Sequence, residues 1–131
     1  MNYLAGLMAS DANPEVRDTR QAVELARLAV KQRPEVGEFW YTLGVAHYRA
    51  GQWRAAQAAL VKARAMLKGH DQCVAEFTLA MACWQAGERQ RARDCYDQAV
   101  RDARALDPPG RMVEALWAEA AALLKLPAPD R

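Results

Sequence analysis

The strongest constraint on the fold of this chain is an internal repeat of about 36 residues. The segment 39–63 aligns without a gap with the segment 75–99, and the alignment pairs Leu43 with Leu79. A second offset, of 34 residues, extends the pattern of small residues backward to the segment 22–29. Repetition at this length is typical of proteins built from stacked supersecondary units.

Each unit divides at a glycine into two stretches with helical periodicity. Larger residues recur at helical spacing before Gly51 and again after it, from Trp53 to Leu60. Glycine adopts the left-handed conformation that ends a helix, so the chain can reverse at Gly51 and at its counterpart Gly87. Alanine, the residue with the highest helix propensity, dominates the apolar set. We therefore predict an all-α fold of helical hairpins, with helices near residues 2–9, 20–33, 37–50, 53–67, 71–86, 89–106 and 111–125.

Small residues occupy matching positions in the two units. They are Gly44, Ala56 and Ala63 in one, and Ala80, Ala92 and Ala99 in the other. A hydrogen or a methyl group at such positions lets two helices approach closely, while larger neighbours fill the space beside it. We therefore expect Ala56 and Ala92 to be almost fully buried.

The repeated pattern resembles the tetratricopeptide repeat. The second unit carries W-x-x-L-G at 40–44, and the residues that follow match the family pattern nearly position by position. The third unit has Glu76 where an aromatic residue is expected, and the usual tyrosine is replaced by His47 and Cys83. The resemblance implies a right-handed α-solenoid of three helix hairpins plus a C-terminal capping helix.

The resemblance also organises the chain as a single domain, residues 1–131. Repeat 1 is expected over about 2–35, repeat 2 over about 37–70, repeat 3 over about 73–106, and the capping helix over about 111–126. Within repeat 1, the connection around Asn13 and Pro14 is predicted to be a long exposed loop. The whole chain is also similar to repeat arrays at the ends of some bacterial signalling proteins, including Ser/Thr kinases. This similarity implies a regulatory or scaffolding context.

Charge and composition argue against nucleic-acid and membrane partners. The chain has 18 basic and 16 acidic residues and a net charge of +2, whereas such partners require a marked excess of one sign. No run approaches the roughly 20 apolar residues needed to cross a bilayer. The stretch 1–9 has no basic region of the kind that begins a secretory signal. Three cysteines without a CxxC pair fit a reducing compartment, so we expect a cytoplasmic protein.

No residue pattern predicts a catalytic, metal or cofactor site. His70 and Cys73 are three residues apart, but zinc requires about four ligands and no second pair has suitable spacing. His47 is expected to be a core histidine satisfied by its neighbours, and Cys83 a buried, inert thiol. We therefore expect no enzyme and no cofactor. An activity lost on changing either residue, with the fold intact, would revive the catalytic alternative.

A second apolar stripe runs along the first helix of each hairpin. Tyr41, Val45 and Tyr48 are spaced i, i+4, i+7, and 36 residues later the stripe recurs as Phe77, Met81 and Trp84. In the tetratricopeptide family the first helices line a concave surface that contacts peptide ligands. The resemblance therefore implies a partner-binding surface of Tyr41, Val45, Tyr48, Arg49, Phe77, Met81, Trp84 and Gln85, with Asn2 and Gly6 as counterparts in repeat 1.

The residues of the stripe also indicate the kind of partner. The positions where the family's carboxylate clamp has asparagine and lysine hold Val45, Met81, Tyr41 and Phe77 here, so a chaperone-tail ligand is not expected. The partner should be a protein or peptide with apolar or aromatic side chains, and Arg49 is placed to hold an acidic group. Two alternatives remain at this point. The stripe could simply pack neighbouring helices together, or it could join copies of the chain into a homo-oligomer, as could an exposed end helix.

Overall fold

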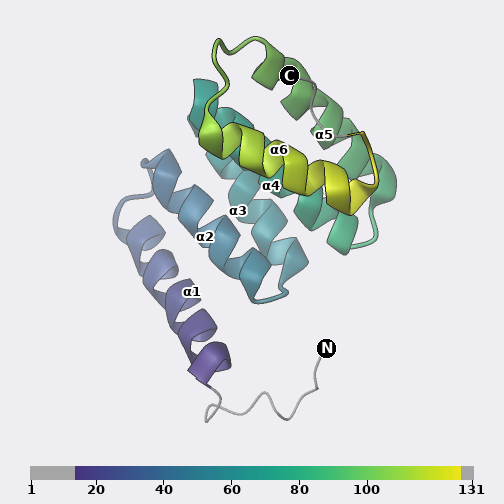
Figure 1. Ribbon diagram of the computed structural model, residues 1–131. Helices are drawn as coiled ribbons and strands as arrows, with labels where there is room; N and C mark the ends of the chain where they lie inside the picture. Colours follow the sequence, from purple (N-terminus) through teal and green to yellow (C-terminus); the bar gives the residue numbers. More distant parts are fainter. Residues whose placement is uncertain (1–13, 128–131) are drawn as a thin grey trace.

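The computed structural model describes residues 14–127, which form six α-helices and, within that range, no β-strand. The helices are α1 (Pro14–Gln32), α2 (Gly37–Arg49), α3 (Trp53–Met66), α4 (Gly69–Gln85), α5 (Arg89–Arg104) and α6 (Arg111–Leu124) (Figure 1). The prediction of an all-α chain is thus confirmed, and the ends of α2 to α6 lie within two residues of those expected. The predicted first helix near 2–9 lies outside the described residues.

The start of α1 corrects one prediction. We expected an exposed loop around Pro14 and a helix from about residue 20, but α1 begins at Pro14 itself. Proline has no N–H to donate and a φ angle near that of a helix, so it is favoured in the first helical turn, where the N–H groups have no intrahelical acceptor. Further along α1, Val23, Ala26 and Val30 are buried, and the helix packs against α2.

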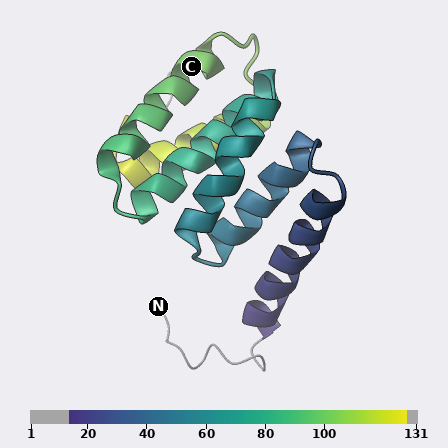
Figure 2. The same cartoon turned by 180° about the vertical axis from the view of Figure 1, so that it is seen from behind.

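Two helical hairpins follow α1 and repeat one another. α2 packs against α3 and α4 against α5, while α3 and α4 join the two pairs (Figure 2). At the turns, Gly51 has φ +76° and Gly87 has φ +86°, which is the left-handed region that favours glycine. The chain therefore reverses at both of the predicted glycines.

Close contacts between the helices form at the predicted small residues. Ala56 and Ala92 are both 0% exposed, as expected. A Cβ atom built on Gly44 would lie 2.5 Å from Cγ of Leu60, so only glycine permits this approach of α2 to α3 without a shift in the core.

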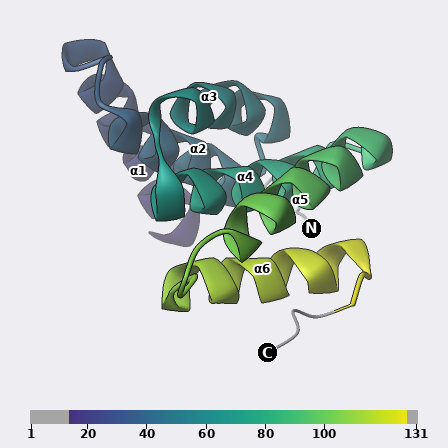
Figure 3. The ribbon, with the colours of Figure 1, turned by 90° about the horizontal axis from the view of Figure 1, so that it is seen from above.

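The last helix lies under the second hairpin. α6 packs mainly against α4 and less against α5, on the side of α4 away from α3 (Figure 3). Val113 and Trp117 are buried in this contact. The connection before α6 is held by His70, whose Nε2 lies 3.0 Å from the carbonyl oxygen of Pro108. This placement of α6 decides which residues of α4 remain accessible.

Candidate functional site

A groove of about 680 Å³ opens between α1, α2, α4 and α6. We call it the central groove. It is lined by Asp18, Thr19 and Ala22 of α1, by Tyr41, Thr42, Val45, Ala46, Tyr48 and Arg49 of α2, by Thr78 and Met81 of α4, and by Met112, Leu116 and Glu119 of α6. α2 and α4 carry the two predicted stripes, while α1 adjoins α2 and α6 adjoins α4. The volume lies within the range of roughly 300–1,000 Å³ that is common for ligand sites.

The predicted site residues of α2 all line this groove. Tyr41, Val45, Tyr48 and Arg49 share one broad face of the helix because Val45, Tyr48 and Arg49 follow Tyr41 at spacings of four, seven and eight residues. Tyr41, Val45 and Tyr48 are partly exposed, and Arg49 is exposed. The ring of Tyr48 is held in place by Trp53, with ring centroids 5.2 Å apart and planes tilted by 59°. α2 therefore presents two oriented aromatic rings and one guanidinium group to the groove.

The predicted residues of α4 divide between the groove and the core. Met81 lines the groove although only 2% of it is exposed, so it contributes to the floor. Phe77 is 0% exposed, and the prediction that part of its ring stays open for a partner is wrong. Its ring lies edge-on to Tyr96 at a centroid distance of 5.8 Å and stacks on Trp117 of α6 at 5.9 Å. α6 therefore covers this end of the stripe.

Trp84 and Gln85 do not appear among the residues that line the groove. The face of the Trp84 ring is taken by the guanidinium group of Arg89, 4.0 Å from the ring centroid. Gln85 is exposed and its Nε2 donates a hydrogen bond of 3.4 Å to the hydroxyl of Tyr48. Both residues thus lie beside the groove rather than in it, which corrects their predicted place in one continuous surface.

α6 and α1 contribute groove residues that the sequence reasoning missed. Met112, Leu116 and Glu119 are spaced i, i+4, i+7, the same spacing as the stripe of α2. That spacing was a usable signal, since Met112 leaves an exposed apolar side chain that a purely capping helix does not need. On α1, Asp18 had no comparable signal because the segment before residue 20 was interpreted as a loop, and Ala22 was interpreted as a small packing residue of the repeat although it is exposed.

The hydroxyl of Tyr41 lies in a partly desolvated and charged environment. Burial raises the pKa of Tyr41 above its ordinary value, the hydrogen-bonded Thr78 hydroxyl and the charge of Arg49 oppose this increase, and the carboxylate of Glu119 adds to it. The phenol is therefore neutral at physiological pH and available as a hydrogen-bond donor or acceptor. Side chains of α4, α6 and α2 itself thus determine the polarity around the Tyr41 ring.

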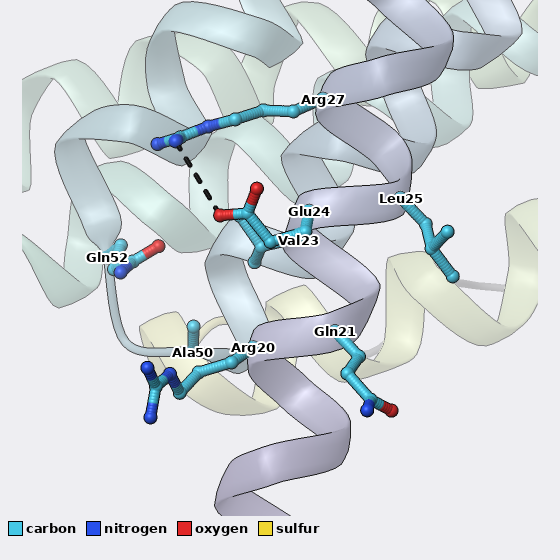
Figure 4. Close-up of a pocket in the computed structure, with 8 residues that line it drawn as sticks. All are labelled: Arg20, Gln21, Val23, Glu24, Leu25, Arg27, Ala50 and Gln52. Atoms are coloured by element: carbon cyan, nitrogen blue, oxygen red, sulfur yellow. Dashed lines mark ion pairs between the residues drawn. The ribbon is translucent and has the colours of Figure 1, made fainter.

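A second hollow, of about 640 Å³, lies beside α1 at the turn between α2 and α3. Figure 4 shows Arg20 and Arg27 extending from α1 on the same side as Gln52, while Leu25 points away. Glu24 pairs with Arg27 at 3.9 Å, and both side chains are more than half exposed. An exposed ion pair of this kind contributes little energy, and none of the described residues that line this hollow is aromatic. We therefore regard the central groove as the candidate site.

The residues considered for chemistry occupy structural positions. His47 is 4% exposed and its Nδ1 lies 2.7 Å from Oε1 of Gln52, as expected for a core histidine. Cys83 is 0% exposed, and its pKa is raised by a hydrogen bond to the thiol of Cys95 and by burial. Between residues 14 and 127 no cluster of His, Cys, Asp or Glu is arranged to hold a metal ion. In the same range no helix is long and apolar enough to cross a membrane.

One buried acid stands apart from the groove. Glu76 is 2% exposed, and its Oε1 has no hydrogen-bond partner within the described part of the chain. Burial raises the pKa of Glu76 to about 8, helped by the adjacent carboxyl group of Asp102 and opposed by Arg64 and Gln72. Glu76 is the residue that stands where the repeat pattern calls for an aromatic side chain. Its environment is that of a protonated core residue.

No family model, no curated protein and no solved structure matches this chain. The geometry of the central groove is therefore the basis for its proposed function.

Proposed function

We propose that this chain is a protein-interaction module of the tetratricopeptide type, which binds a peptide or protein segment in the central groove. The observation that carries the proposal is the pair of partly exposed rings, Tyr41 and Tyr48, beside the exposed side chain of Met112. Tyrosine is enriched at binding hot spots because it buries a large area at a small cost in conformational entropy. Methionine adapts to apolar ligands of varied shape.

The repeat supports the family and the architecture that we propose. The hairpin α2–α3 recurs 36 residues later as α4–α5, with the turn glycines and the buried alanines at equivalent positions. We infer from this repetition a right-handed α-solenoid in which α6 caps the last hairpin. On this view the chain is a non-catalytic binding module, with signalling or scaffolding as its context.

Panning of a phage-displayed library of random dodecapeptides on the immobilised protein tests the proposal. Selected peptides should bind the wild type and Met66→Ser but not the double variant Tyr48→Ala/Met112→Ser. Met66 is 42% exposed on α3 and does not line the groove, so its replacement is a matched control for that of Met112. Circular dichroism checks that each variant is folded. Peptides that bind the double variant as well as the wild type would contradict the proposal.

A second candidate function is self-association through α1. Leu25 and Leu28 of α1 are 68% and 52% exposed, so the described part of the chain leaves more than half of each side chain uncovered. Two exposed leucines one turn apart are a typical element of a helix–helix interface. Light scattering after size-exclusion chromatography would then show a dimer that the double variant Leu25→Ser/Leu28→Ser dissociates. A wild type that is monomeric up to millimolar concentration would exclude this function.

A further inference from the structure

We propose that the segment bound in the central groove is cationic, with Lys or Arg next to apolar side chains. This inference rests on the proposed function and specifies the partner. It differs from the expectation drawn from the stripe alone, in which Arg49 was placed to hold an acidic group of the partner. The residues that change the conclusion, Asp18 and Glu119, lie on α1 and α6.

The charged groups of the groove come from three helices. Among the described residues, the lining carries two carboxylates, of Asp18 and Glu119, and one guanidinium group, of Arg49. Asp18 and Glu119 are exposed, and neither side chain forms an ion pair or a hydrogen bond with a described residue. A ligand can therefore approach both carboxylates without first breaking an internal contact, and the described lining residues together carry one net negative charge.

Aromatic rings beside carboxylates favour a cation over an anion. The negative face of a tyrosine ring attracts an ammonium or guanidinium group within about 6 Å of the ring centroid. Arg49 and Glu119 both lie near enough to Tyr41 for their charges to act on the phenol, Arg49 more strongly, so a cationic group at this ring must approach from the side of Glu119. An arginine or lysine side chain of the ligand can thus lie over the Tyr41 ring with its charged end toward Glu119. Arginine also has the planar shape that pairs with a carboxylate through two hydrogen bonds.

Much of the remaining groove lining is apolar, so the ligand residues next to the cationic one should be apolar too. Val45 lies between Tyr41 and Tyr48 along α2 and Met81 of α4 contributes to the floor, while Met112 and Leu116 add apolar surface from α6. Burial of methyl and methylene groups there favours binding by roughly 25 cal/mol per Å² of apolar surface removed from water. The ligand should therefore alternate basic residues with Leu, Ile, Met or an aromatic residue, and a purely polar basic peptide should bind poorly.

The test uses the dodecapeptides selected by panning that depend on Tyr48 and Met112. Their sequences should be enriched in Lys and Arg relative to the unselected library. For the tightest of them, Glu119→Lys and Asp18→Lys should each weaken binding by about threefold to tenfold at low ionic strength, and the loss should shrink as salt is added. Glu38→Lys is the control, because Glu38 is exposed on α2 but outside the groove lining.

The outcomes separate this inference from the proposed function. Groove-dependent peptides enriched in Asp or Glu, or unaffected by Glu119→Lys and Asp18→Lys, would overturn the cationic ligand and leave a peptide-binding groove. A library that gives no peptide dependent on Tyr48 and Met112 would overturn both. Circular dichroism checks that each variant is folded. If the variant Asp18→Asn/Glu119→Gln still binds uncharged apolar peptides, its loss of affinity for cationic peptides is electrostatic.

Discussion

Trp117 stacks on Phe77 with their ring centroids 5.9 Å apart and their planes 20° from parallel. This contact joins α6 to α4 and places Phe77 in the core beside Tyr96, where it is 0% exposed. The same helix brings Met112 and Glu119 to the groove. α6 is therefore both a cover for the hydrophobic end of α4 and a wall of the candidate site.

Phe77→Ala should destabilise the fold by about 3–5 kcal/mol, because it leaves a cavity between the rings of Tyr96 and Trp117. Tyr48→Ala should cost less, since the Tyr48 ring is partly exposed at the groove. Urea denaturation followed by circular dichroism measures both free energies of unfolding. Equal losses for the two variants would show that Phe77 is not covered by α6.

Ala92→Leu should destabilise the protein by about 1–3 kcal/mol, because three added carbon atoms must fit where the alanine is already 0% exposed. The matched control is Ala58→Leu, an exposed position on α3 where the same change should alter the free energy of unfolding by less than about 0.5 kcal/mol. Thermal and urea denaturation give the comparison. A control variant as unstable as Ala92→Leu would refute the close packing of α4 and α5 at this position.

The helices from α2 onward could be predicted from the sequence because each boundary has a local cause. Gly51 and Gly87 end their helices by adopting positive φ angles, and the repeated alanines mark the faces that meet. Pro14 had two consistent interpretations, since proline is common both in loops and in the first turn of a helix. Local chemistry alone did not distinguish them.

The groove could be predicted only in part, because exposure depends on which helix covers a stripe. Tyr41, Val45 and Tyr48 follow from spacing within α2. The burial of Phe77 depends on Trp117, which is 40 residues away in the chain, and nothing near Phe77 encodes that contact. The carboxylates of Asp18 and Glu119 likewise reach the groove through the packing of α1 and α6, which the residues near Tyr41 in the sequence do not encode.

The free energy of unfolding should fall between about pH 4.5 and pH 8 through the contribution of Glu76. Its pKa is raised to about 8 in the folded protein from an ordinary value of 4.5, so the folded state retains a proton that the unfolded chain releases. This stabilisation is complete below the pKa that Glu76 has in the unfolded chain, and it is lost as the pH rises through the pKa that Glu76 has in the folded protein. It should amount to roughly 3–5 kcal/mol, at 1.36 kcal/mol per pKa unit.

Glu76→Gln is the matched control for this pH dependence, because the amide has nearly the same shape and does not titrate in this range. Urea denaturation at intervals from pH 4.5 to 8.5 should give a clearly flatter profile for the variant than for the wild type. Parallel profiles would mean that Glu76 is ionised in the folded protein.

Tyr48→Ala should weaken a groove-bound peptide by about 30-fold, corresponding to a loss of about 2 kcal/mol for a hot-spot aromatic residue. Trp84→Ala should change the affinity by less than about threefold, because Trp84 is stacked with Arg89 and does not line the groove. Isothermal titration calorimetry with a panned peptide measures both. The reverse order of effects would move the binding surface to the end of α4.

Methyl NMR of methionine gives the most direct test of the central groove as the binding site. Protein labelled with ¹³C at the methionine methyl groups reports on Met81 at the groove floor, Met112 at its edge and Met66 on α3 away from it. Resonances are assigned with single Met→Leu variants and followed while a panned peptide is added. The account predicts that the Met81 and Met112 signals shift with the added peptide and that the Met66 signal stays in place. A shift of Met66 with Met81 and Met112 unchanged would contradict it.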